Sequence, residues 1–381
     1  VGSGGAPRAA IAMGKKDHDT AEKIVGNCFT LLTGLAVILT ILFYISAPTL
    51  LKLFGASSAT MSYATAYARI YILGSFFVLI VLGMNPFITT QGFAKISMMT
   101  TVIGAVINII LDPVFIFVLG MGVKGAALAT VLSQAVGAIW ILCFLTGKKT
   151  ILRLKKENMR LEVRVFGPCL ALGISTFVML STESLLSISF TNSLSRYGGD
   201  VAVGAMTILT STMQFAMLPL QGIGQGAQPI ISYNYGADKP ERVKKAFFTQ
   251  FCACVAYTFT FWAVIMFFPQ VFASIFTANK ELVEYSSWAL RIYMAGIFST
   301  GFQISCQQSF MALGPAKVSL LLACLRKIVL LIPLIFILPN FFDNKVFAVF
   351  LAEPVSDIIA AAVTTITFFT LFNSILKKEK R

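Results

Sequence analysis

The chain has 381 residues, of which 57% are hydrophobic and 12% charged, and its mean hydropathy is +0.83. Soluble domains carry about 25% charged residues, so this composition excludes a soluble globular protein and indicates a membrane protein. The formal net charge of +14 does not indicate nucleic-acid binding, because the basic residues follow the pattern of membrane topology signals.

Ten apolar stretches are long enough to cross a bilayer as helices, since one crossing takes about 20 residues. Lipid offers no hydrogen-bond partner to exposed backbone, and these stretches are too long and continuous for barrel strands. We therefore predict an all-α polytopic membrane protein with helices near 27–54, 66–90, 98–119, 126–146, 165–191, 205–232, 247–275, 287–312, 318–338 and 347–371.

The connections between these helices alternate between basic and nearly neutral. One set of connections holds 21 of the 30 Lys and Arg residues, including those of the 148–164 linker and of the basic tail 374–381. The other set has one basic residue in each connection or none. Because positive connections stay inside the cell, the linker and the C-terminus are predicted to be cytoplasmic.

The seven cysteines and the single histidine do not form a redox or metal motif. The cysteines lie mostly within apolar stretches and none belongs to a CxxC pair, so they are interpreted as small hydrophobic residues. His18 has no second ligand residue nearby. We expect no metal site other than one for Na⁺ at Asp112, which applies if the coupling ion is Na⁺.

The sequence matches itself without gaps at an offset of 222 residues. The register holds over nearly 100 residues, which indicates an internal duplication. The matching segments are GSGGAP (2–7) with GQGAQP (224–229), RIYILG (69–74) with RIYMAG (291–296), and GFAKIS (92–97) with GPAKVS (314–319).

The duplication also predicts the domain organisation. Helix 165–191 has no counterpart in the first half, because its start near Arg164 maps to position −58. We therefore expect an intact protein with about 58 more N-terminal residues and twelve helices in two six-helix bundles, about ten of them complete here. The predicted parts are an N-terminal bundle (1–147), a cytoplasmic linker (148–164), a C-terminal bundle (165–373) and the tail (374–381). Repeated halves around a central site are typical of secondary transporters.

Asn108 and Asp112 lie four residues apart and share one face of helix 98–119. Pro113 cannot donate to the carbonyl of Ile109, which frees an oxygen one turn below. Thr130, on the next helix, adds a hydroxyl at a similar depth, ~8–10 Å from the membrane surface at 1.5 Å per residue. The set suits a proton or a small cation, and the alternative is a protonated carboxyl that makes an interhelical hydrogen bond.

Three further acids lie within predicted spans. Glu183 on helix 165–191 has no basic partner in its own helix and is either a proton or ion site or a structural group. Glu353 and Asp357 share a helix face, and Arg326 of helix 318–338 is the expected partner of one of them in a structural ion pair.

Five residues are candidates for lining a substrate cavity. Methionine adapts its shape to flat apolar compounds, and the candidates comprise two methionines, one phenylalanine and two glutamines: Met213, Phe215, Met217, Gln303 and Gln307.

The segment NIILDPVFIFVLGMGVKGAALATVLSQ (108–134) resembles the first-half signature of the multidrug and toxic compound extrusion (MATE) transporters. PLQGIGQGAQPIISYNYGADKPERVKKA (219–246) resembles the second-half signature, especially in the bacterial MepA-like and DinF-like branches. The resemblance covers the whole chain. It implies a MATE-type fold of two V-shaped bundles and an antiporter that exports cationic, amphipathic drugs in exchange for Na⁺ or H⁺.

The resemblance also implies roles for single residues. Asn108, Asp112 and Thr130 match the coupling site of DinF-like members, whose further Asp on helix 1 would lie in the segment expected before Val1. Glu183 matches an ion- or proton-carrying Glu of the NorM branch, but Gln303 stands in the stretch where that branch has a second acid. This difference favours coupling through Asp112.

For the protein as a whole, the resemblance implies a monomer in the bacterial cytoplasmic (inner) membrane that contributes to antibiotic resistance. Its partners would be drug-like small molecules and membrane lipids, with no cofactor and no nucleic acid. One alternative is a lipid-linked oligosaccharide flippase of the same superfamily, which would need a strongly cationic cavity. The other is an integral membrane enzyme, for which one histidine and scattered acids provide no catalytic cluster.

Overall fold

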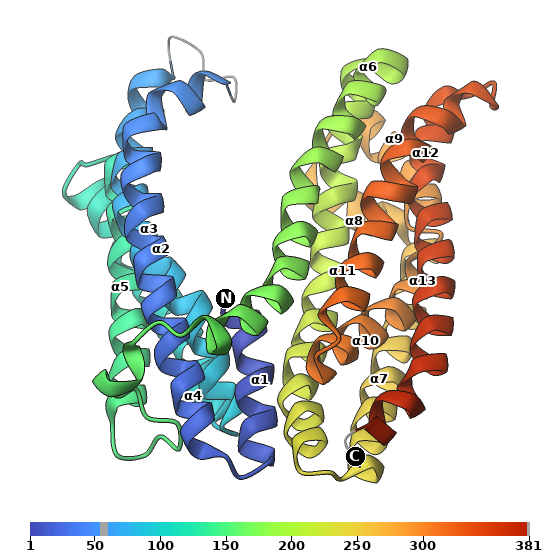
Figure 1. The fold of residues 1–381 in the computed structure, drawn as a ribbon. Helices are drawn as coiled ribbons and strands as arrows, with labels where there is room; N and C mark the ends of the chain where they lie inside the picture. The colour runs from blue at the N-terminus through green and yellow to red at the C-terminus, as the bar shows by residue number, and fades with distance from the viewer. Residues whose placement is uncertain (54–59, 379–381) are drawn as a thin grey trace. The chain divides into compact units, whose positions relative to one another are not determined.

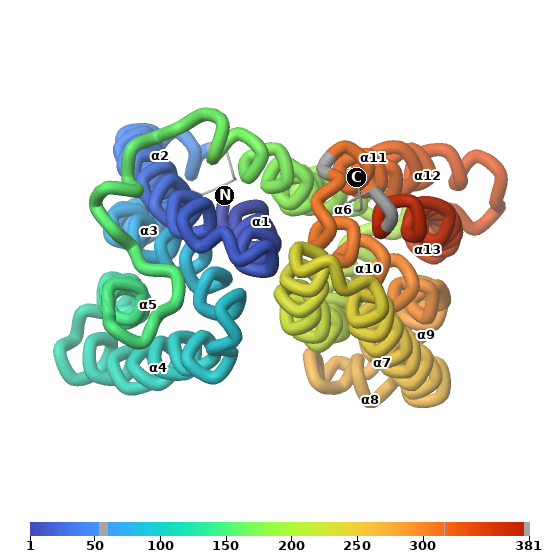
Figure 2. The backbone as a smooth tube through the Cα atoms, turned by 60° about the horizontal axis from the view of Figure 1, so that its bottom comes forward, coloured from blue at the N-terminus to red at the C-terminus, as the bar shows by residue number. Residues whose placement is uncertain are grey.

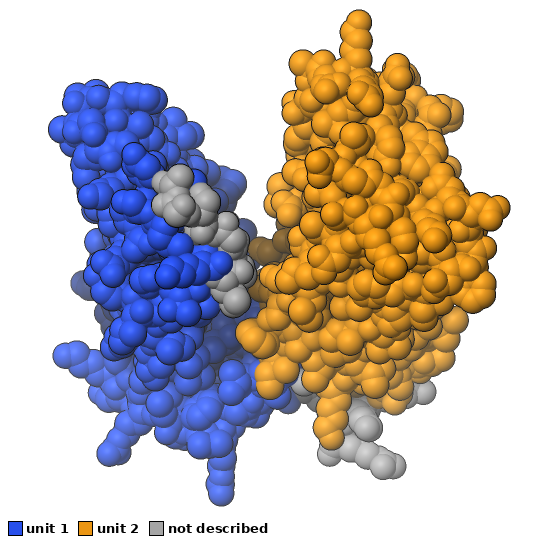
Figure 3. Space-filling view, turned by 90° about the horizontal axis from the view of Figure 1, so that it is seen from above, with its two compact units in different colours: residues 1–173 blue, residues 174–381 orange. Residues whose placement is uncertain are grey.

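The computed structural model describes residues 1–53 and 60–378, and the chain divides into two compact units, Val1–Gly173 and Ile174–Arg381. Figure 3 colours these units separately. The division lies after the predicted 148–164 linker, because that linker and the first turns of the following helix pack with unit 1. Residues 379–381 of the predicted basic tail lie outside the described residues.

Unit 1 is a bundle in which α3 packs against α2 and α5, and α4 packs against α5 (Figures 1 and 2). Its core is built of small and aliphatic residues with one large aromatic, Phe87, fully buried at the centre. The elements are α1 (Gly2–Gly14), α2 (His18–Leu53), α3 (Met61–Thr90), α4 (Ala94–Pro113), the π-helical η1 (Val114–Val118), α5 (Val123–Thr146) and the 3-10 turn η2 (Lys156–Met159).

Unit 2 is built from α6, which begins in unit 1 at Val163, and the elements that follow it. Gly199 has φ 63° and ψ −160° and divides α6 into the two predicted spans. The elements are α6 (Val163–Gly236), α7 (Pro240–Phe267), α8 (Pro269–Phe276), α9 (Lys280–Tyr293), α10 (Ile297–Leu313), α11 (Ala316–Cys324), the π-helical η3 (Leu325–Leu331), α12 (Ile332–Ile337), η4 (Leu338–Asn340) and α13 (Lys345–Lys378).

Among the described residues, eight helices are long and apolar enough to cross a membrane, with α6 counted once. Their large apolar side chains are often exposed, as at Ile45 (75%) and Phe117 (78%). Lipid tails are as apolar as these side chains, so such exposure is expected of a membrane-spanning surface. The fold is therefore that of an all-α, multi-pass membrane protein, as predicted.

The predictions of one continuous helix over 247–275 and over 287–312 are wrong. The chain forms α7 and α8 with a break at Phe268, and α9 and α10 with a break at residues 294–296. At Gly296 an added Cβ atom would lie 2.7 Å from the Cα atom of Pro354 in α13. The second break and the glycine thus accommodate a close backbone approach that the apolar pattern does not reveal.

The 222-residue repeat appears in the backbone of both units. The left-handed residues Lys16 (φ 64°) and Asp238 (φ 49°) are repeat equivalents, as are Gly92 (φ 88°) and Gly314 (φ 96°). Each pair marks the same helix-to-helix turn in the two units, α1 to α2 with α6 to α7, and α3 to α4 with α10 to α11. The duplication inferred from sequence is therefore also a duplication of structure.

The segment 148–162, here called the strap, is held on unit 1 by buried polar side chains. The Gln91 Oε1 atom accepts hydrogen bonds from Thr150 Oγ1 (2.8 Å) and from the backbone N–H groups of Ile151 (2.7 Å) and Leu152 (2.9 Å). Gln91 is 6% exposed and Leu152 is fully buried. The strap is thus a packed part of unit 1, running from α5 across to α2 (Figure 2).

Two residues of α2 hold the second part of the strap. The Glu22 carboxylate accepts hydrogen bonds from Arg153 N (3.2 Å) and Lys155 Nζ (2.6 Å), and the latter bond raises the pKa of Lys155. The Asn27 Oδ1 atom accepts from Glu162 N at 2.7 Å. Because backbone N–H groups are obligatory donors, these side chains determine where the strap lies.

Replacing Gln91 with leucine is expected to loosen the strap. Two backbone N–H groups would lose their acceptor, and each such loss costs about 1–3 kcal/mol when the group is buried. Trypsin should then cut the strap of the purified protein at least about tenfold faster. Thr150→Val is the matched control, since it removes one donor and leaves both amides bonded. Equal cleavage of the wild type and both variants would contradict this account.

Candidate coupling site

Three of the four residues predicted for ion or proton coupling come together in unit 1. The Asn108 Nδ2 atom donates to Asp112 Oδ1 (3.4 Å) and to Thr130 Oγ1 (3.5 Å). Thr130 Oγ1 in turn donates to the carbonyl of Ala126 at 3.0 Å. All three side chains are half-buried. The amide thus bridges the carboxylate of α4 and the hydroxyl of α5.

Two local features bring α4 and α5 to this position. Pro113 ends α4, and the next five residues form the π-helical η1, whose wide turn is closed by the bond from Leu119 N to Val114 O. Isolated π turns are frequent at functional sites. At Gly125 of α5 an added Cβ atom would lie 2.8 Å from the carbonyl carbon of Phe115. Only glycine permits this approach, which lies about one helical turn from Thr130.

The arrangement offers oxygen atoms of three chemical types to a cation. They belong to the carboxylate of Asp112, the amide of Asn108 and the hydroxyl of Thr130. Hard cations such as Na⁺ prefer oxygen ligands, and a carboxylate can equally bind a proton. The hydrogen bonds of the set are 3.4 and 3.5 Å long, longer than the usual 2.9–3.0 Å. Little interaction energy would therefore be lost when an ion enters.

Glu183 lies apart from this set in the chain, on α6 in unit 2. Its side chain is 64% exposed and accepts a hydrogen bond from Lys327 Nζ of η3, whose own side chain is only 7% exposed. The same ammonium group donates to the carbonyl of Met179 at 3.0 Å. The partner that Glu183 lacks in its own helix is thus supplied by η3.

A second charged network in unit 2 joins η3 to α13. Arg326 Nε donates to Asp357 Oδ1 at 2.6 Å, and Nη2 donates to Glu353 Oε1 at 3.0 Å. Both acids are almost fully buried, with side-chain exposures of 1% and 5%. Ser356 Oγ donates to the carbonyl of Arg326 at 2.8 Å. The expected ion pair is therefore present, with both acids on one arginine.

The residues predicted to line a substrate cavity occupy different environments. Phe215 is 62% exposed, whereas Met213 is buried and Met217 packs beside it against the core of unit 2. Gln303 is buried, and its Oε1 atom has no hydrogen-bond partner within the described part of the chain. All five residues lie in unit 2.

Gln307 has a structural partner that the repeat explains. Its Nε2 atom donates to the carbonyl (2.9 Å) and hydroxyl (3.0 Å) of Ser319 in α11. These two hydrogen bonds join α10 to α11. The repeat equivalents are Asn85 and Ser97, where Asn85 Nδ2 donates to the Ser97 carbonyl at 3.3 Å. Both units thus use the same amide-to-serine contact, which accounts for Gln307 without a substrate.

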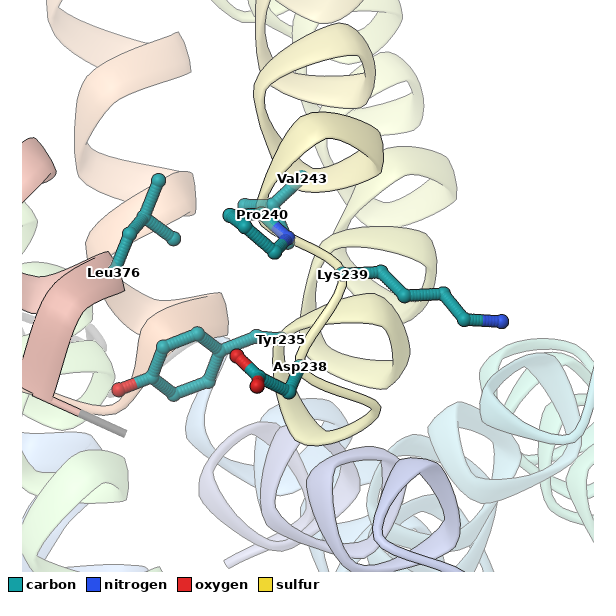
Figure 4. Close-up of a pocket in the computed structure, with 6 residues that line it drawn as sticks. All are labelled: Tyr235, Asp238, Lys239, Pro240, Val243 and Leu376. Carbon is teal, nitrogen blue, oxygen red and sulfur yellow. The ribbon is translucent and has the colours of Figure 1, made fainter. Parts of the chain in front are cut away.

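A small hollow lies at the turn from α6 to α7 (Figure 4). It contains none of the predicted coupling or cavity residues, and its lining consists of Tyr235, Asp238, Lys239, Pro240, Val243 and Leu376.

Lys327 is the site residue that sequence reasoning missed. The available signal was the Arg326–Lys327 pair within an otherwise apolar run, since two buried cations need at least two acids.

Known proteins resemble this chain in both sequence and fold. The MatE family model matches residues 1–114 and 175–337. The multidrug export protein MepA of Staphylococcus saprophyticus is 24% identical over 366 residues, covering 95% of this chain and 80% of that protein. MepA of Staphylococcus aureus strain NCTC 8325 is 24% identical over 343 residues, covering 87% and 72% respectively.

Solved structures show the same fold. A crystal structure of MATE in the bent conformation aligns with a TM-score of 0.94 and 22% identity, covering all of this chain and 84% of the other. An outward-facing multidrug resistance MATE family transporter of the MOP superfamily aligns with a TM-score of 0.93 and 23% identity, covering 98% and 84%.

Proposed function

Because the chain belongs to the MatE family, a family of transporters rather than enzymes, we propose that it exports cationic, amphipathic drugs in exchange for Na⁺ or H⁺. The curated relatives are multidrug export proteins, which supports drug efflux. Exchange would proceed by alternating access in the bacterial cytoplasmic membrane, with the strap and the C-terminus on the cytoplasmic side. The protein would act as a monomer among membrane lipids, without a cofactor.

The arrangement of Asn108, Asp112 and Thr130 is the observation that carries the coupling part of this proposal. It combines an intramembrane carboxylate, a costly group whose presence indicates a function, with neighbouring amide and hydroxyl oxygens. A coupling ion changes a conformational equilibrium only if it binds the two states with different affinity. Asp112 supplies that difference by taking up or releasing a positive charge.

The flippase alternative is not favoured by the buried charges of unit 2. A pyrophosphate-linked lipid would need unpaired basic groups, but Arg326 and Lys327 are both engaged by acids. A site built on them would first have to expel three carboxylates.

Ethidium efflux from energised cells tests the proposed function. Cells that express the protein should lose preloaded ethidium faster than cells without it, and collapse of one of the two gradients, that of the coupling ion, should stop this loss. If efflux persists with both gradients collapsed, ion-coupled antiport is excluded. If it never exceeds that of cells without the protein, export of this substrate class is excluded.

A further inference from the structure

Two neighbouring cations of η3 are held in opposite ways. Arg326 is bound by two carboxylates that are almost fully buried, whereas Lys327 is bound by Glu183, whose side chain is 64% exposed. Arg326 and Lys327 are consecutive, so their side chains leave η3 in different directions, and Arg326 reaches α13 while Lys327 reaches α6. The acids of the first contact are buried, whereas the acid of the second is largely exposed.

The position of the Lys327 ammonium group has the features of a cation site. It is formed by a carboxylate and a backbone carbonyl, those of Glu183 and Met179, which lie four residues apart on one face of α6. Both groups are oxygen ligands, and one carries a negative charge. Throughout residues 1–53 and 60–378, the Glu183 carboxylate has no hydrogen-bond or ion-pair partner other than Lys327.

We propose that Lys327 is a tethered cation that fills a cation-binding position on α6, and that the positive group of a substrate binds Glu183 by displacing it. The ligand class is a monovalent organic cation with an apolar body, which matches the exposed apolar residue one turn before Glu183, Leu180 (68% exposed). This inference rests on the proposed function, since it assigns a binding residue to the exported compounds.

Displacement leaves both groups with a partner. When a substrate cation binds Glu183, the Lys327 ammonium group keeps the carbonyl of Met179 as an acceptor, and Glu183 keeps one positive partner. Arg326 cannot substitute for Lys327, because both of its acids would then be left without a partner inside the protein. Lys327 therefore sets the affinity of Glu183 for external cations by competing with them.

Ethidium binding to the purified protein, measured by fluorescence anisotropy, tests the inference with a double-mutant cycle. Lys327→Met removes the internal competitor, so ethidium should bind at least about threefold more tightly than to the wild type. Glu183→Gln should weaken binding, and Lys327→Met should give no gain in the Glu183→Gln background. Lys327→Arg is the control that keeps the charge and should leave the affinity within about twofold of the wild type.

The outcomes separate this inference from the proposed function. If the wild type binds and exports ethidium but Lys327→Met binds it no more tightly, Lys327 is only a structural partner of Glu183 and the inference fails alone. A gain that persists in the Glu183→Gln background also overturns it, because the released carboxylate would not be the site. Absence of ethidium binding in every variant contradicts both proposals. Thermal unfolding of each variant shows whether the fold is retained.

Discussion

Replacing Asp112 with asparagine is expected to abolish ethidium efflux while the protein accumulates in the membrane at its normal level. Asparagine has nearly the same volume and keeps an oxygen acceptor for Asn108 Nδ2, so the packing of α4 against α5 should be retained. It cannot take up or release a proton, and it offers no negative charge to Na⁺. Transport should fall to the level of cells without the protein, measured as the initial rate of ethidium loss.

Asn108→Ala and Thr130→Val provide graded comparisons for this experiment. Each removes one neutral oxygen and leaves the carboxylate, so each should reduce the rate about tenfold, as expected for one lost neutral ligand. Thr146→Val is a matched control, because Thr146 is an exposed threonine at the end of α5 whose hydroxyl donates to the carbonyl of Leu142, one turn earlier. Full efflux by a well-expressed Asp112→Asn variant would remove Asp112 from the coupling site.

Replacing Arg326 with methionine is expected to cause the largest loss of stability. It leaves Glu353 and Asp357 buried beside each other without a cation. Breaking a buried ion pair by removing one partner costs about 3–5 kcal/mol. The variant should give little folded protein, seen as a low monodisperse yield and a much lower unfolding temperature in detergent.

The charges of this network predict that loss of the arginine lowers stability much more than loss of one acid. Arg326 carries one positive charge against two acids, so Glu353→Gln leaves a balanced pair of Arg326 with Asp357. That variant should unfold close to the wild-type temperature, and Glu353→Gln combined with Arg326→Met should be less damaging than Arg326→Met alone. An Arg326→Met variant that is as stable as Glu353→Gln would show that the network contributes little.

The convergence of Asn108, Asp112 and Thr130 could be predicted because it depends on local rules. A four-residue spacing places two side chains on one helix face, and the depth of each residue follows from its distance along a span. The helical spans and the duplicated architecture follow from equally local information, namely apolar length and a fixed repeat offset. The close match of left-handed residues across the repeat confirms that register.

The contacts of unit 2 could not be predicted in the same way. Glu183 and Lys327 are 144 residues apart, and their meeting depends on how η3 packs against α6. The break before α10 depends on the approach of Pro354 to Gly296, while the equivalent Gly74 lies inside the continuous α3, next to Val131. Similar local sequence thus gives different backbone paths because the packing partner differs.

The strap shows a related limit of prediction from the sequence. Its composition, rich in Lys and Arg, predicts a solvated cytoplasmic linker, and most of its basic side chains are indeed exposed. Its backbone is nevertheless anchored by Gln91, Glu22 and Asn27. Such anchors are invisible in composition, because they join side chains of one segment to backbone groups of another.

Transport by the purified protein in proteoliposomes, with a Na⁺ gradient or an H⁺ gradient imposed separately, tests the central claim most directly. The account predicts that one of the two gradients drives ethidium across the membrane against its concentration, and that Asp112→Asn abolishes this movement while Thr146→Val does not. Uphill movement that is the same in Asp112→Asn, or movement driven by neither gradient, would contradict coupling through this carboxylate.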